Sequence, residues 1–411
     1  MNLLVKDKCF YKKMAVIAIP ISLQSMITIG VNMTDTVMVG KLGETSLSAT
    51  ALANQFVNIY QICCMGIAMG ASVLTSRFWG MQDITSLKKT ITLMLRLCIV
   101  LAVLFMLPTI LIPQLLMRMY TNDSAVIAQG VQYFKWMVYC YFLQGMTMTC
   151  TIVLRSVGQV NFPLFTSIGS FFVNILFNYM FIFGKLGVPR MEVEGAGVGT
   201  LIARVFEFSL ICGYFLFVDR KIGYRLKDLR MKCNSLIKDY VSISIPVFVS
   251  DSLLALGTSA VAMVMGRIGT GFVSANSITV VTQQLTTVVI QGICHASCIM
   301  TGHTLGHGER EKAQQQAWTF LILGLVVGIL GGGLIKVLSR PIIGLYNITP
   351  ETAQIAGELM DAIAFIVIFQ SMNSILTKGV LRGGGDTKFL MVADIIFLWA
   401  ASLPLGILAG L

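Results

Sequence analysis

Long apolar runs separated by short polar segments recur from one end of the chain to the other. An α-helix needs about 20 mostly apolar residues to cross a bilayer, and most of these runs reach that length. The pattern predicts eleven spans, at 14–39, 49–72, 91–116, 126–154, 162–183, 195–218, 240–265, 272–299, 318–337, 353–377 and 389–411. The third contains Pro108 and Pro113 and is therefore predicted to kink or to end early. We expect an all-α polytopic membrane protein.

The first span carries a carboxylate inside its apolar run. Asp35 follows Thr28 and Asn32 at spacings that place all three side chains on one face of a helix. A charged side chain at the centre of a bilayer costs about 2.5–3.5 kcal/mol on insertion scales, so an intramembrane acid is a functional candidate by default. Asp35 is predicted to face a polar or hydrated space. The simpler interpretation is a buried acid that only links neighbouring helices through hydrogen bonds.

Composition supports the membrane assignment and narrows the partners. Hydrophobic residues make up 56% of the 411 positions and charged residues 12%, whereas a soluble domain has about 25% charged residues. The net charge of +11 does not indicate a nucleic-acid partner, because the basic residues lie mainly in loops between apolar runs. We therefore expect a lipid bilayer as the surroundings and a small molecule as the substrate. The ten cysteines lie mostly in apolar runs and are interpreted as packing residues.

The positions of lysine and arginine predict an orientation. Most of them fall in the loops that a cytoplasmic N-terminus would place inside the cell. The longest and most basic of these loops, 219–239, separates an N-terminal lobe at 1–218 from a C-terminal lobe at 240–411. We expect a multi-pass protein of the plasma membrane, monomeric, with its N-terminus in the cytoplasm.

The two lobes repeat one sequence pattern. Matching positions are Pro20 and Pro246, Gly40 and Gly266, Gly43 and Gly269, Gly80 and Gly306, and LRSVGQ from Leu154 with LRGGGD from Leu381. Six predicted spans separate the two copies, so both begin on the same side of the membrane. The pattern predicts two parallel six-helix repeats around a cleft, with the twelfth helix missing from this chain.

These motifs in their order resemble the multidrug and toxic compound extrusion (MATE) family. The resemblance runs through Pro20, TDTVMVGKLG, RFWGMQD, LRSVGQ and NILFNYMFIFG and covers essentially the whole chain. It implies two six-helix lobes and a secondary antiporter that expels amphipathic, usually cationic, compounds in exchange for protons or sodium. It also implies a coupling-ion site, because Asp35 falls on an acid of the first helix. The further positions of that site are Asn174, Asn178 and Thr200.

The chain departs from part of the family in its second half. Some relatives carry acids where this sequence has Leu254 and Ser371, so the resemblance does not carry over a C-terminal cation site. Asp251 lies on the same helical face as Leu254 and is a candidate to replace the missing acid.

Amide side chains form matching stripes in the second and eighth spans. Asn54, Asn58 and Gln61 recur at helical spacing, and Asn58 and Gln61 correspond to Gln284 and Thr287 under the repeat. Facing lipid, each amide would be left without a hydrogen-bond partner. The predicted substrate cavity therefore comprises Thr28, Asn32, Asn58, Gln61, Asp251, Gln284 and Gln291. Hydrogen bonds between helices are the alternative role of these stripes.

The chemistry of coupling stays open between two ions. A buried carboxylate can bind a proton, and oxygen ligands also suit sodium, a hard cation. No Walker A motif is present, and His303 and His307 have no third ligand nearby in sequence, so no ATP, metal or other cofactor is expected.

Arg204 and Glu207, three residues apart, are predicted to neutralise each other. Lys135 and Asp394 have no predicted partner.

Three functions are compatible with this architecture to different degrees. The first is an antiporter of drugs or metabolites, and the few basic residues inside the spans favour cationic substrates. The second is a flippase of lipid-linked oligosaccharides or other lipids from the same superfamily. The third is an integral membrane enzyme, which would need acids or histidines clustered at a membrane surface, and the sequence shows no such cluster.

Overall fold

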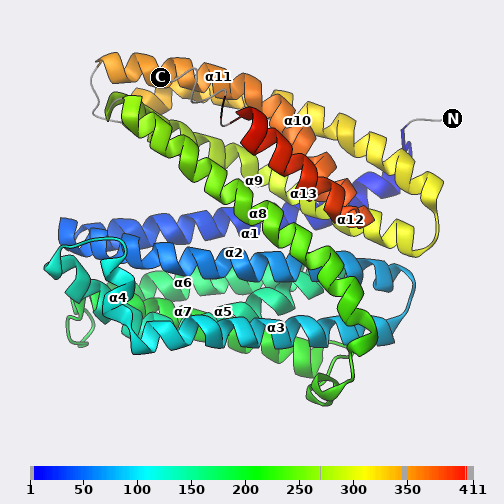
Figure 1. Ribbon diagram of the computed structural model, residues 1–411, viewed down its shortest axis with the longest axis horizontal. Helices are drawn as coiled ribbons and strands as arrows, with labels where there is room; N and C mark the ends of the chain where they lie inside the picture. The colour runs from blue at the N-terminus through cyan, green and yellow to red at the C-terminus, as the bar shows by residue number, and fades with distance from the viewer. Residues whose placement is uncertain (1–3, 269, 345–349, 403, 405–411) are drawn as a thin grey trace. The chain divides into compact units, whose positions relative to one another are not determined.

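The computed structural model describes residues 4–268, 270–344, 350–402 and 404, and the regular elements of that part of the chain are helices (Figure 1). They are α1 (Lys8–Gly40), α2 (Glu44–Gly80), α3 (Ile84–Leu111), α4 (Pro113–Arg118), α5 (Ser124–Ser156), α6 (Asn161–Phe183), α7 (Glu192–Gly213), η1 (Tyr214–Val218), η2 (Leu226–Arg230), α8 (Asn234–Ile268), α9 (Thr270–Gly306), α10 (Arg310–Gly344), α11 (Pro350–Ser374), η3 (Ile375–Leu381), α12 (Arg382–Gly384), α13 (Thr387–Ile395) and η4 (Ile396–Ser402).

Ten helices in the described part of the chain are long and apolar enough to cross a membrane. This confirms the all-α polytopic fold predicted from the hydrophobic pattern. The predicted eleventh span begins within α13, and its end lies outside the described residues.

Local sequence signals set several helix ends. The backbone N–H of Ile112 donates to the Pro108 carbonyl, and Pro113 then opens the separate helix α4. A proline has no N–H to continue a helix but fits its first turn, so the third span ends early, as predicted. The Asp83 carboxylate accepts a 3.0 Å hydrogen bond from the Ser86 N–H and caps the start of α3.

The described chain forms two compact units. One contains Gln24–Thr75 and Asp83–Ser244, and the other contains the residues up to Leu23, Ser76–Gln82 and the chain from Ile245 onward. Helices α1, α2 and α8 each contribute a segment to both units. Lobes at 1–218 and 240–411 stay a prediction from the repeat.

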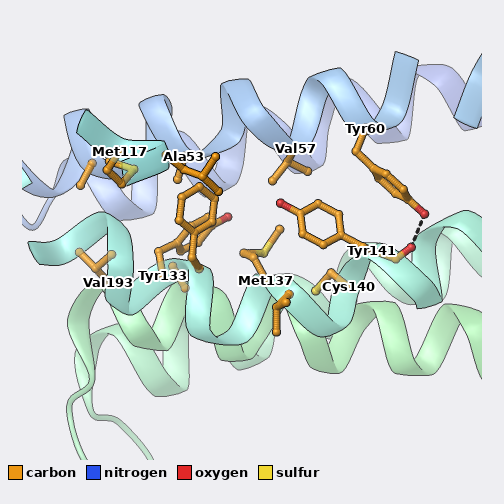
Figure 2. Close-up of a cluster of buried hydrophobic side chains, with 14 of the residues drawn as sticks. Ala53, Val57, Tyr60, Met117, Tyr133, Met137, Cys140, Tyr141 and Val193 are labelled. Carbon is orange, nitrogen blue, oxygen red and sulfur yellow. Dashed lines mark hydrogen bonds between the residues drawn. The ribbon is translucent and has the colours of Figure 1, made fainter. Parts of the chain in front are cut away.

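A buried aromatic cluster fills the core of the first unit, where α2 faces α5 (Figure 2). The Tyr60 hydroxyl donates a 2.5 Å hydrogen bond to the backbone carbonyl of Tyr141, and the two rings meet edge to face. Ala53 and Cys140 are buried in the same cluster. This packing fixes α2 against α5, and both helices also contribute to the cavity described below.

Glycines bring α10 and α11 together in the second unit. A Cβ at Gly324 would lie 3.2 Å from the Met372 Cα, and a Cβ at Gly328 would lie 2.8 Å from the Ile368 Cα. The small residues therefore allow the backbones of α10 and α11 to approach closely.

Candidate functional site

The Asp35 carboxylate on α1 is held by amide side chains of α6. The Asn178 Nδ2 donates to Asp35 Oδ1 at 2.6 Å and lies 3.2 Å from the Asn174 Oδ1. The two asparagines are one turn apart on α6 and are almost completely buried. Hydrogen bonds to a charged acceptor are stronger than those between neutral groups. The structure thus brings together three of the four residues predicted to bind the coupling ion.

A cavity of about 340 Å³ lies against this carboxylate. Segments of α1, α2, α5, α6 and α7 enclose it, all within the first compact unit. Residues predicted from sequence that line it are Thr28, Asn32, Asp35, Asn58, Gln61, Asn174 and Thr200. The polar stripes of the first and second spans therefore converge on one space. Small-molecule sites have volumes of about 300–1,000 Å³, so the cavity can hold a compact ligand.

The wall formed by α7 carries an ion pair. Arg204 Nη1 lies 2.9 Å from Glu207 Oε2, which confirms the predicted neutralisation at this spacing. Both side chains line the cavity, and the charge of Arg204 acts on the Asp35 carboxylate as well as on Glu207. The spacing in sequence indicated the pair but not its position in the wall of the Asp35 cavity.

A glycine on α7 makes room for the α6 amide. A Cβ at Gly199 would overlap the Asn178 Oδ1 and would lie 2.8 Å from the Asn178 backbone nitrogen. Helices α6 and α7 pack side by side here (Figure 1). The glycine-rich start of α7 therefore serves helix packing, and it places Thr200 at the cavity.

Sequence reasoning missed the contribution of α5 to the site. Gln144, Met137 and Tyr133 line the cavity from this helix, and the Tyr133 hydroxyl lies 3.2 Å from the Asn54 Oδ1. Figure 2 shows Tyr133 and Met137 extending from α5 toward α2. The available signal was a single amide, Gln144, in an otherwise apolar stretch of α5, at helical spacing from Met137 and Tyr133.

The predicted cavity residues of the second half lie in the other unit. Asp251 forms a two-point ion pair with Arg382, with N–O distances of 2.9 and 3.3 Å, and Arg382 is only 4% exposed. Gln284 and Gln291 are exposed residues of α9. Their role in a substrate cavity stays a prediction.

Two charged residues without a predicted partner have one in the structure. The Asp394 carboxylate accepts a hydrogen bond from the Ser250 hydroxyl. Lys135 Nζ lies 3.9 Å from Glu194 Oε1, with both side chains partly exposed.

A polar network recurs at corresponding positions of the two halves. In the first, Arg155 Nη2 donates to Gln24 Oε1 at 2.5 Å, and Gln24 Nε2 donates to the Ser167 hydroxyl at 2.8 Å. In the second, the equivalent positions hold Arg382, Ser250 and Asp394, and the Ser250 hydroxyl donates to Asp394 as Gln24 does to Ser167. Both halves therefore keep an arginine in contact with a polar side chain of the proline-containing helix, but in the second half the contacted residue is the carboxylate of Asp251, one position after the equivalent of Gln24.

The MatE family model matches residues 20–180 and 246–408, the two halves of the internal repeat. This chain belongs to the MatE family. The family consists of transporters and not of enzymes, so the enzyme alternative falls away.

Named relatives match over most of their own length. The chain is 24% identical to the "Uncharacterized transporter YisQ" of Bacillus subtilis over 384 residues, which cover 92% of this chain and 82% of the relative. It is also 24% identical to the "Probable multidrug resistance protein NorM" of Thermotoga maritima over 401 residues, covering 96% and 84%.

Solved structures share the fold. The Vibrio cholerae MATE transporter VcmN, solved as a mutant, superimposes with a TM-score of 0.89 at 17% identity, covering 98% of this chain and 92% of VcmN. An outward-facing multidrug resistance MATE family transporter gives a TM-score of 0.83 at 19% identity, covering 97% and 92%. These likenesses support the arrangement of helices.

Proposed function

We propose that this transporter exports amphipathic, cationic drugs or metabolites in exchange for protons or sodium ions. The observation that carries the proposal is the Asp35 carboxylate in the wall of a polar cavity, bonded to the buried amide of Asn178. The NorM relatives, named as multidrug resistance proteins, support export of drugs. No cofactor beyond the coupling ion enters the mechanism.

Asp35 binds the coupling ion in this proposal. With its carboxylate charged, the cavity attracts an organic cation. Binding of a proton or of sodium neutralises the carboxylate and weakens that attraction, so the cargo leaves. Asn178, Asn174 and Thr200 supply polar atoms around the ion, and Asp35 gives the only full charge among these four residues.

The cavity does not favour the flippase alternative. The charged residues of the described lining are two carboxylates and one guanidinium, and the guanidinium is paired with Glu207. An anionic lipid-linked cargo would need an excess of basic groups.

Transport in proteoliposomes tests the assignment of Asp35. We expect one of two gradients, of protons or of sodium, to drive transport of the fluorescent cation ethidium by the parent protein. The gradient that drives transport identifies the coupling ion. Asp35→Asn should abolish this movement. Asp361→Asn is the matched control, because this acid is exposed, pairs with Lys336 and is not among the residues that line the cavity. Transport by Asp35→Asn at the parent rate under both gradients would overturn the proposal.

We further propose that the protein acts as a monomer in the plasma membrane with a cytoplasmic N-terminus. The basic segment 219–239 supports this orientation, since positive loops remain in the cytoplasm. The exposed Cys9 near the N-terminus offers a test in a variant that lacks the other cysteines. An impermeant thiol reagent should label Cys9 in inside-out vesicles and not in intact cells, and the reverse result would overturn the orientation.

A further inference from the structure

The cavity has more acidic than basic side chains in its described lining. Its described lining contains the carboxylates of Asp35 and Glu207 and the guanidinium of Arg204. The cavity wall thus carries one net negative charge when all three groups are ionised, and none when Asp35 holds a coupling ion.

The net charge of the cavity depends on Arg204, because this is the one basic side chain in its described lining. It lies 2.9 Å from Glu207 and is 30% exposed, while Glu207 is 13% exposed. Its side chain lines the same cavity as Asp35, and its charge also acts on that carboxylate. Arg204 therefore offsets one of two carboxylates that would otherwise both attract a cationic cargo.

We infer that Arg204 determines substrate charge, restricting the cavity to organic cations with a single positive charge. Without it, the wall would carry two negative charges with Asp35 free and one with the coupling ion bound. A doubly charged cargo would then bind more tightly, and coupling would no longer remove the attraction. The inference rests on the proposed function, because it takes the cavity as the cargo site and Asp35 as the ion site.

Two dyes with one ring system provide the test. Ethidium has a single positive charge, and propidium adds a second quaternary ammonium group to the same phenanthridinium ring. Binding to purified protein is measured by fluorescence titration, counting only the signal displaced by tetraphenylphosphonium. The readout is the affinity for propidium divided by the affinity for ethidium.

Opposite shifts are expected from the two neutralising variants. Arg204→Gln should raise the propidium-to-ethidium ratio about tenfold, and Glu207→Gln should lower it by a similar factor, because one unit charge in a partly solvated site changes ion binding by about that amount. The double variant Arg204→Gln/Glu207→Gln should return the ratio to the parent value. Arg204→Lys, which keeps the charge, should leave the ratio unmoved.

A merely structural ion pair gives a different result. Breaking it from either side would weaken both dyes in parallel, and the ratio would stay constant or move in one direction for both single variants. Either outcome overturns the inference. If Arg204→Gln is not monodisperse, an unchanged ratio in Glu207→Gln alone overturns it.

Failure of the inference is separable from failure of the proposed function. If Asp35→Asn abolishes ethidium transport and the ratio does not respond to Arg204→Gln, only the role of Arg204 is wrong. If Asp35→Asn transports as the parent does, the proposed function itself is wrong, whatever the ratio.

Discussion

The amide of Asn178 and the carboxylate of Asp35 lie 2.6 Å apart, joining α6 to α1 at the wall of the cavity. Asn178 is buried and Gly199 of α7 leaves no space beside it, so the amide cannot move far. The orientation of the Asp35 carboxylate therefore also depends on α7, although no hydrogen bond joins α7 to this carboxylate among the described residues.

Gly199→Ala should impair transport without removing any polar group. The added methyl would overlap Asn178 and displace its amide from Asp35. We expect at least a tenfold loss of ethidium transport, comparable to the loss of one interaction with a charged group at about 1.5–3 kcal/mol. Gly213→Ala on the same helix is the control, since a Cβ there meets nothing within 4 Å. Equal activity of the two variants would contradict this packing argument.

The two arginines of the repeated network should differ in their importance for stability. Arg382→Met leaves the Asp251 carboxylate unpaired, and removing one partner of a buried ion pair costs about 3–5 kcal/mol. Arg155→Met leaves only the neutral Gln24 amide, with an expected cost of about 1–3 kcal/mol. Thermal unfolding in detergent should show the larger fall in Tm for Arg382→Met.

A second substitution distinguishes lost pairing from lost packing at this site. Asp251→Asn in the Arg382→Met background should recover part of the lost Tm, because it removes the unpaired charge. No recovery would indicate that the arginine acts through packing alone.

Neighbouring glycines of α10 should respond differently to the same change. A Cβ at Gly332 would overlap the Ala364 carbonyl of α11, whereas a Cβ at Gly333 meets nothing within 4 Å. We expect Gly332→Ala to destabilise the protein by about 1–3 kcal/mol through overpacking. Gly333→Ala should be neutral or slightly stabilising, since alanine favours a helix by up to about 1 kcal/mol. Thermal unfolding of both variants is the measurement, and similar Tm values would contradict the contact.

Asp83 should make the stability of the start of α3 depend on pH. Hydrogen bonds from the Ser86 side chain and backbone hold the pKa of this carboxyl below its usual value. Because the folded-state pKa is lowered, the stabilisation is present above the unfolded pKa of about 3.9 and is lost as the pH falls through the folded value. Asp83→Ala should lower stability by about 0.5–2 kcal/mol at pH 7, and the difference should shrink below pH 4.

Asp83→Asn is the matched variant for this cap. Its amide oxygen can still accept from the Ser86 N–H but does not titrate, so its stability should fall less steeply than that of the parent between pH 5 and pH 3. Unfolding curves measured between pH 5 and pH 3 test this prediction. If the stability of the parent and of Asp83→Asn falls in parallel with pH, the Asp83 charge has no role in the cap.

The sequence by itself determined the helices and the family. Hydropathy and proline positions are local properties, so the spans and the early end of α3 at Leu111 followed from them. Helical spacing also placed Arg204 with Glu207, because neighbours on one helix face are set by its period. Asn174 and Asn178 followed from the family resemblance.

Only the tertiary structure decided which helix faces meet. Asp35 contacts Asn178 across 143 residues, and Asp251 contacts Arg382 across 131. Such pairs depend on how side chains of different helices pack, which no local period encodes. For the same reason, the sequence paired Arg204 with Glu207 but did not place its side chain in the wall of the Asp35 cavity, where it lies.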